Sequence, residues 1–87
     1  MKFNTEDEII KKMNDNQYGL SSGIYTSDLA RAMRVSKAIR AGITFVNTYR
    51  LISPSAPFGG IKDSGYGTEL SPIGILEFTY PKTIWVK

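Results

Sequence analysis

The spacing of apolar positions near the start of the chain predicts a helix. Residues 5–8 place a threonine three residues before a glutamate, which is the capping-box pattern, with acidic side chains in the first turn. Ile9, Ile10 and Met13 follow at positions that share one helical face. Residues 14–19 contain asparagine, aspartate and glycine, which predict the end of the helix. We expect it to be about ten residues long.

The most regular helical spacing of apolar residues in the chain lies between two short runs of residues that favour strands. Residues 23–26 and 43–47 are rich in β-branched and aromatic side chains. Between them, apolar residues recur at helical spacing, after a Thr-Ser-Asp cap and before Gly42, the expected stop. A strand, a helix and a strand in this order predict a βαβ unit with a right-handed crossover. Functional groups then gather at the carboxyl ends of the strands, where Asn47, Thr48 and Tyr49 lie.

The second half of the chain predicts an irregular loop, a short helix and a final strand. Residues 53–67 contain prolines and glycines that disfavour regular structure. Ser71 and Pro72 are typical of the N-cap and first turn of a helix, which we expect to run through Phe78. Residues 83–86 are an apolar, β-prone run whose partner is not evident in the chain. The predicted fold class is α/β, with a βαβ centre, a Gly/Pro-rich loop, a third short helix and a C-terminal strand.

Composition excludes several classes of function. The 87 residues contain no cysteine and no histidine, which removes disulfide frameworks, thiolate and imidazole metal sites, cysteine nucleophiles and Ser-His-Asp triads. The sequence therefore predicts no catalytic residue and no metal site of these kinds. No apolar run approaches the roughly 20 residues of a membrane span, and the chain opens on a polar, acidic segment unlike a signal peptide. We accordingly expect no membrane association and a cytoplasmic location.

The positive charge of the chain is concentrated in the predicted central helix. The net charge is +3, and four cations recur every three residues: Arg31, Arg34, Lys37 and Arg40. Such a basic stripe could bind an anion or the phosphates of a nucleic acid weakly, although a solvated helix face is the commoner explanation. No RNP motif, zinc-finger spacing or helix-turn-helix pattern accompanies it, so nucleic-acid binding is the least favoured hypothesis.

Several motifs, spread along the whole chain, resemble one enzyme family. Residues 57–70, PFGGIKDSGYGTEL, closely resemble the PFGG-x-K-x-SG-x-G-x-E-x signature near the C-terminus of NAD(P)-dependent aldehyde dehydrogenases. Residues 16–29 resemble the family's N-x-x-YGL-x-xG-x-(F/Y)T and DL segments, and residues 38–48 its (A/L)-x-xG and VN segments. Residues 77–85 resemble its closing (Y/F)T-x-x-KT-(V/I)-x run.

The resemblance implies the end of a catalytic domain. The family oxidises aldehydes to carboxylic acids: a cysteine thiolate attacks the aldehyde, hydride passes to the nicotinamide of NAD or NADP, and the thioester is hydrolysed. In the family, the nucleotide-binding domain, the catalytic cysteine and the glutamate base lie upstream of this segment. Residues 1–87 are therefore expected to be an inactive, truncated aldehyde dehydrogenase-like fragment that binds no cofactor alone. Gly65-Tyr66-Gly67 lacks the third glycine and the strand-to-helix setting of a dinucleotide site.

By the same resemblance, a few residues would shape the active site without reacting. In the family, the loop between the VN strand and the PFGG motif helps to form the aldehyde entrance tunnel, and simple packing is the alternative for its apolar residues. Asn47 would help to fix the active-site architecture or would serve only as a local turn-former. Lys62 is expected at the solvated surface or in a capping contact. The tunnel candidates are Leu51, Ile52 and Phe58, and the glycines expected to provide positive φ angles or close backbone approach are Gly59, Gly60, Gly65 and Gly67.

The end of the chain predicts an interaction with another subunit. In the family, the last strand joins an oligomerisation sheet, which here implies residues 82–87 and in particular Thr83, Ile84, Trp85 and Val86. An apolar strand left as an open edge invites pairing with another chain. The alternative is pairing within the chain, with residues 23–26 or 43–47. Homo-oligomers or other aldehyde dehydrogenase subunits are therefore the expected partners. A self-associating interaction module, or a complementing subunit of a split enzyme, is the alternative function.

Overall fold

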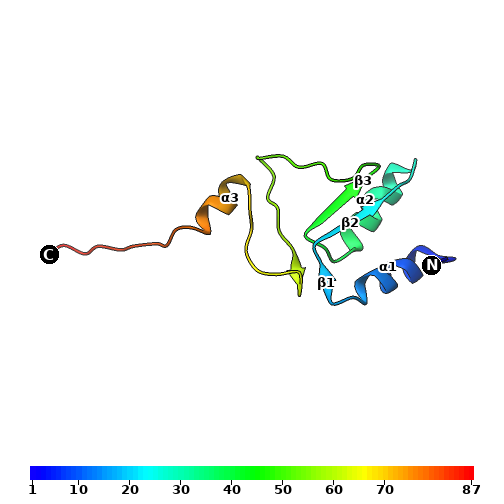
Figure 1. Cartoon of the computed structure of the whole chain (residues 1–87), viewed down its shortest axis with the longest axis horizontal. Coiled ribbons are helices and arrows are strands. Elements are labelled where there is room, and N and C mark those ends of the chain that lie inside the picture. Colours follow the sequence, from blue (N-terminus) through cyan, green and yellow to red (C-terminus); the bar gives the residue numbers. More distant parts are fainter.

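In the computed structural model of the chain, two parallel strands and the helix that connects them form the centre of the fold (Figure 1). β2 (Ser21–Ile24) pairs with β3 (Ile43–Val46), so that Ser21 lies opposite Ile43 and Ile24 opposite Val46. α2 (Leu29–Ala38) runs between them. The predicted βαβ unit is confirmed, with the first strand shifted toward the N-terminus of the predicted run because residues 25–28 form the entry to α2.

α2 is capped at both ends by polar side chains. The Asp28 carboxylate accepts a hydrogen bond of 3.0 Å from the backbone amide of Arg31. The helix ends at Ala38, before the predicted stop at Gly42. Asn14 explains the earlier end, because its side-chain amide donates to the Ala38 carbonyl (2.9 Å) and its oxygen accepts from the Arg40 amide (2.7 Å). These bonds satisfy backbone groups that another helical turn would otherwise use.

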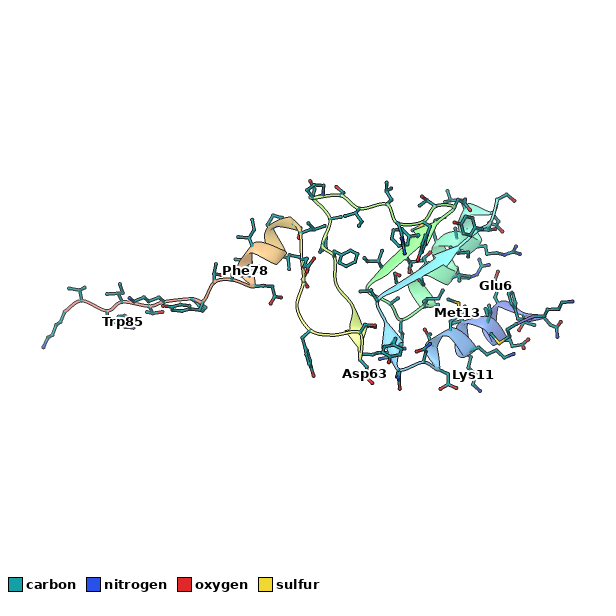
Figure 2. All side chains as sticks on the ribbon, in the orientation of Figure 1. Glu6, Lys11, Met13, Asp63, Phe78 and Trp85 are labelled. Carbon is teal, nitrogen blue, oxygen red and sulfur yellow. The ribbon has the colours of Figure 1, made fainter.

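α1 (Glu6–Asn14) begins as the sequence predicts. The Thr5 hydroxyl accepts from the Glu8 amide at 3.2 Å. The Glu8 carboxylate reaches back to the amide of Asn4 at 3.0 Å, one residue earlier than the usual capping box. α1 lies beside α2, and the Glu6 carboxylate on its first turn binds two arginines of that helix (Figure 2).

A second, very small sheet fastens the later loop to the body. β1 (Tyr18–Gly19) pairs antiparallel with β4 (Ile61–Lys62), where the sequence predicted only a turn and a loop. Strands of two residues have no hydrophobic period by which they could be recognised. Phe58, before β4, and Glu69, after it, form a β-bridge with mutual backbone hydrogen bonds of 2.8 and 2.7 Å.

α3 (Ser71–Leu76) is shorter than predicted and starts differently. Its N-cap is Leu70, with φ 61°, and not Ser71, because the Leu70 carbonyl accepts the first helical hydrogen bond, from the Gly74 amide at 2.9 Å. The Ser71 hydroxyl still accepts from the amide of Ile73 at 3.2 Å. After Leu76 the chain leaves the helix through a turn, so Phe78 lies outside it.

Residues 79–87 extend away from the rest of the molecule without regular structure (Figure 1). They pair with neither residues 23–26 nor 43–47, so the intrachain alternative for the terminal strand is wrong. The strand predicted at 83–86 is not formed within the single chain, which contains no partner for it.

The buried core is confined to the βαβ unit. Ala32, Val35, Ile39 and Phe45 are its buried hydrophobic residues. The radius of gyration is 17.2 Å, against about 12 Å for a compact chain of this length. No helix of the structure combines the length and apolarity needed to cross a membrane.

Candidate functional site

The carboxyl ends of β2 and β3 are joined by the side chain of Asn47. Its Oδ1 accepts from the Thr26 amide at 2.8 Å, and its Nδ2 donates to the Thr26 carbonyl at 2.9 Å. The carboxamide thus pairs with the backbone as a peptide group of a neighbouring strand would. Asn47 has φ 53°, a left-handed conformation that asparagine tolerates better than most residues. This geometry fixes the sheet edge at which α/β proteins place functional groups.

An aromatic and cationic stack follows directly at this edge. The ring of Tyr49 lies edge-on to that of Phe45, with centroids 5.8 Å apart. The guanidinium carbon of Arg50 lies 5.3 Å from the centroid of the Tyr49 ring, which is a cation–π arrangement. Phe45 belongs to the buried core, so the stack is anchored to the βαβ unit. The sequence analysis placed Tyr49 at this edge but did not select Arg50, although a cation that follows an aromatic residue just after a strand can be recognised in the sequence.

Lys62 binds the glycine-rich loop to the end of α1. Its ammonium donates to the carbonyls of Asn14 at 3.0 Å and Asn16 at 2.9 Å. Carbonyls at a helix C-terminus carry partial negative charge and lack helical partners, so a lysine stabilises them. Lys62 was expected either at the solvated surface or in a capping contact, and the structure shows the capping contact.

The glycines of the loop permit close contact between backbone segments. A side chain at Gly42 would meet the carbonyl oxygen of Gly59, and a side chain at Gly59 would lie 2.8 Å from the carbonyl oxygen of Gly67. Gly65 and Gly67 have φ 124° and 83°, which only glycine adopts readily. Gly65-Tyr66-Gly67 is followed by the bridge at Glu69 and not by a helix, so it lacks the geometry of a pyrophosphate-binding turn.

The structure separates the three tunnel candidates. Leu51 and Ile52 are 73% and 60% exposed, in a segment without regular structure. Phe58 is half-buried and lines a cavity of about 330 Å³, together with the four loop glycines, Tyr66 and Phe78. Neither Leu51 nor Ile52 lines that cavity. Within this chain the candidates do not form one tunnel wall.

The largest hollow lies elsewhere, between α1, β2 and α2. It has a volume of about 540 Å³ and is lined by apolar side chains that include Ile9, Ile24 and Val35, with Glu6 and Arg31 among its polar residues. A smaller hollow of about 290 Å³ lies near Tyr18 and Arg40. The one acid that lines the larger hollow, Glu6, is bound by Arg31 and Arg34.

Ion pairs neutralise part of the basic stripe. Glu6 receives hydrogen bonds of 2.8 Å from Arg31 and of 2.8 and 2.9 Å from Arg34. These bonds, that from Arg34 foremost, lower the pKa of the Glu6 carboxyl, and Glu6 in turn raises the pKa of Arg34. Two of the four stripe cations are therefore occupied by an acid of the same chain. This weakens the anion-binding hypothesis.

The perturbed ionisable groups lie away from the sheet edge. A hydrogen bond from Lys12 is the largest cause that lowers the pKa of Glu8. Glu6, Glu8 and Arg34 all belong to the paired helices and bind partners there. No cluster of three or more potential metal ligands is present in the chain.

Comparison with known proteins identifies the family. The sequence profile of the aldehyde dehydrogenase family matches residues 1–84. The chain belongs to the aldehyde dehydrogenase family. Its members are oxidoreductases, and the resemblance drawn from the loop motif is thereby confirmed at the level of the family.

Individual aldehyde dehydrogenases match over nearly the whole chain. A (Z)-2-((N-methylformamido)methylene)-5-hydroxybutyrolactone dehydrogenase of Acinetobacter baylyi is 52% identical over 85 residues, which are 98% of this chain and 17% of that protein. Aldehyde dehydrogenase 1A1 of Homo sapiens is 46% identical over 87 residues, all of this chain and 17% of that protein. The NAD⁺ complex of an aldehyde dehydrogenase from Bacillus cereus superposes with a TM-score of 0.92 at 35% identity, covering 99% of this chain and 18% of that one.

The chain thus corresponds to a small part of each relative. It spans 17% of the length of these curated aldehyde dehydrogenases and 18% of the solved chain. The high TM-score means that the elongated arrangement of the βαβ unit, loop, α3 and tail is found within a complete aldehyde dehydrogenase.

Proposed function

We propose that residues 1–87 form the C-terminal part of the catalytic domain of an enzyme that oxidises an aldehyde to a carboxylic acid with NAD or NADP. The observation that carries this proposal is the combined match over residues 1–84 in sequence and over 99% of the chain in structure. The order of the motifs, with the PFGG loop before the last strand, supports the C-terminal placement.

In this proposal the segment builds the wall of the active site and supplies no reacting group. Asn47 and the loop glycines hold the sheet edge and the loop in place, and Leu51, Ile52 and Phe58 contribute to the aldehyde entrance once the rest of the domain packs on them. The segment contains no cysteine to form the thioester. A polypeptide of these 87 residues alone is accordingly inactive and binds no NAD or NADP.

A chimera tests the proposal directly. Residues 1–87 replace the matching segment of human aldehyde dehydrogenase 1A1, to which they are 46% identical over their whole length. We expect aldehyde-dependent NAD⁺ reduction by the chimera and none by the isolated 87-residue chain. The intact human enzyme is the positive control, and the enzyme lacking the segment is the negative control.

The split-enzyme form of the proposal uses the same proteins. Adding the 87-residue chain to the human enzyme that lacks the segment should restore part of its activity if the chain can act as a complementing subunit. A chimera that assembles to the same solution mass as the human enzyme, but reduces no NAD⁺ with any aldehyde, contradicts the proposed function.

A second candidate function is self-association through residues 82–87. Ile84, Trp85 and Val86 are highly exposed, with Trp85 at 92%, and have no partner within the chain. An apolar segment of this kind favours strand pairing with another subunit. Light scattering over a concentration series should show an oligomer for the parent and a monomer for Ile84→Lys with Val86→Lys.

A matched variant distinguishes strand pairing from non-specific hydrophobic association. Tyr66 is also fully exposed but lies outside the tail, so Tyr66→Lys should leave the oligomer intact. A monomeric parent at every concentration overturns this second candidate. A cytoplasmic location is proposed alongside it and is supported by the similarity to a cytosolic aldehyde dehydrogenase of Rattus norvegicus, 47% identical over 87 residues.

A further inference from the structure

We propose that Arg50 is a specificity-determining residue that binds a carboxylate at the far end of the aldehyde substrate. This inference rests on the proposed function, and it names the substrate class as short aldehydes that carry a second, ionised carboxyl group. It is based on three observations about the Arg50 guanidinium: where it lies, which aromatic ring supports it, and that no acid of the chain pairs with it.

Arg50 lies where a substrate chain would pass. It follows the carboxyl end of β3 and the Asn47 junction, and it immediately precedes the tunnel candidates Leu51 and Ile52. Parallel α/β sheets bind their ligands at this edge. Leu51 and Ile52, the next two residues along the chain, are exposed, so this segment carries both a cationic and apolar side chains that are open to a ligand.

The guanidinium is held in place by the stack beneath it. Arg50 lies over the Tyr49 ring, and Tyr49 is set against Phe45, which is only 8% exposed. A guanidinium placed over an aromatic ring keeps N–H groups that can still donate to a ligand. Because this contact restrains the side chain before the ligand arrives, less conformational entropy is lost on binding.

No acid in the structure occupies this guanidinium. The ion pairs of the chain join Lys12 to Glu8 and both Arg31 and Arg34 to Glu6. Arg50 takes part in none of them and in none of the side-chain hydrogen bonds, and residues 47–60 contain no aspartate or glutamate. Lys12, Arg31, Arg34 and Lys62 have side-chain partners in the chain. Arg50 has none, like Lys37 and Arg40, but of these three cations it alone lies over an aromatic ring.

The chemistry of the open edge favours a carboxylate. A guanidinium presents paired N–H donors that match the two oxygens of a carboxylate, and such charge-assisted bonds are about twice as strong as neutral ones. The neighbouring Leu51 and Ile52 suit a short alkyl chain between that carboxylate and the aldehyde. Succinic semialdehyde has this form, and butanal is its uncharged counterpart of similar length.

The principal experiment measures selectivity in the chimera with human aldehyde dehydrogenase 1A1. The quantity is the ratio of kcat/KM for succinic semialdehyde to kcat/KM for butanal. Arg50→Gln removes the charge at similar size and should lower this ratio about tenfold, the effect of losing one hydrogen bond to a charged group. Arg50→Lys should retain part of the ratio, and Tyr49→Leu should lower it by a smaller factor because only the support is lost.

Lys37→Gln is the matched control. It removes one positive charge from an exposed position on α2, away from the sheet edge, and should leave the ratio unchanged. Equal falls for Lys37→Gln and Arg50→Gln would mean general attraction of anions and would overturn the proposal. Equal losses on both substrates in Arg50→Gln would also overturn it, because Arg50 would then pair with an acid of the enzyme.

A binding measurement on the 87-residue chain is independent of catalysis. Titration with succinate should shift the NMR signals of the Arg50 Nε–H and the Tyr49 ring in a saturable way, whereas succinamide should not. The shift should vanish in Arg50→Gln and persist in Lys37→Gln. Absence of the shift in the parent chain contradicts the carboxylate site, whereas an inactive chimera contradicts the proposed function, so the two failures are distinguishable.

Discussion

The first fifty residues and the last eighteen use their apolar side chains in opposite ways. In the βαβ region, Val35, Ile39 and Phe45 are buried between the helix and the strands. In residues 70–87, the apolar side chains of α3 and the tail are all exposed, including Phe78 at 93%. In Figure 2, Phe78 and Trp85 lie on the extension that runs away from the body of the molecule, whereas Met13 lies on α1.

The contrast distinguishes sequence that folds itself from sequence that needs a partner. Both regions have apolar residues in periodic patterns, so hydrophobicity alone does not separate them. The βαβ region connects elements close in sequence, and its helix covers its own strands. The C-terminal region has a six-residue helix and a tail with no intrachain surface to cover them, which leaves their hydrophobic contribution unrealised.

Phe45→Ala should have the largest effect on stability. Removing a buried aromatic ring costs about 3–5 kcal/mol, enough to unfold a small domain. Phe78→Ala, which truncates the same side chain in the exposed region, should change the unfolding free energy by less than about 0.5 kcal/mol. Urea unfolding followed by circular dichroism measures both. Comparable losses for the two variants would refute the division into a self-folding and a dependent region.

Gly42→Ala should have the next largest effect on stability, because it disrupts the contact between the body and the loop. The added methyl group would overlap the Gly59 carbonyl oxygen, and overpacking of this kind costs about 1–3 kcal/mol. Gly23→Ala is the control, since the nearest atom to its new carbon is the Phe45 carbonyl oxygen at 3.9 Å. The loss should appear as a lower thermal midpoint for Gly42→Ala only.

Lys62→Met tests a weaker attachment of the same loop. Loss of the ammonium leaves the carbonyls of Asn14 and Asn16 to water, at a cost of about 1 kcal/mol. Lys82→Met, in the exposed tail, should leave stability unchanged. Hydrogen exchange should accelerate at the end of α1 in Lys62→Met. Unchanged exchange there would show that the loop is held by its backbone contacts alone.

The smallest expected effect is the pH dependence from Glu6. Its folded-state pKa is lowered below the ordinary value of 4.5, mainly by Arg34 and then Arg31, so the carboxylate binds fewer protons in the folded chain. The stabilisation is fully present above the ordinary pKa of the unfolded chain and disappears as pH falls through the lowered folded pKa. Glu6→Gln should flatten this acid branch of the unfolding free energy, whereas Asp7→Asn, which removes an acid outside the ion pairs, should not. An unaltered acid branch in Glu6→Gln would mean that the ion pairs do not link α1 to α2 in solution.

The sequence predicted the self-folding region better than the dependent one. α1, α2 and the parallel pair followed from helical spacing, capping residues and β-branched runs. The pairing of β1 with β4 did not, because two residues carry no period and their contact spans more than forty positions. The predicted terminal strand requires hydrogen-bond partners that the chain does not contain, so no reading of residues 83–86 alone could place it.

The candidate site was predicted in part for a similar reason. Asn47 was recognised at the end of a strand, where local side-chain bonds are common, although its pairing with Thr26 depends on the sheet register. Leu51, Ile52 and Phe58 were grouped because the matching loop of the family helps to form the aldehyde tunnel. In this chain Phe58 lines a separate loop cavity. Arg50 could be recognised only after the structure placed it on Tyr49 and showed which other cations had partners.

The junction at Asn47 also makes the sheet edge sensitive to chemical ageing. The carboxamide both donates to the Thr26 carbonyl and accepts from the Thr26 amide, whereas an ionised carboxylate can only accept. Deamidation would replace Nδ2 by an oxygen that faces the carbonyl oxygen across the present 2.9 Å, so an attraction would become a repulsion between two acceptors. A single hydrolysis, with no change in the gene, would thereby loosen the carboxyl ends of the two strands. The stack of Tyr49 and Arg50 follows directly after these ends.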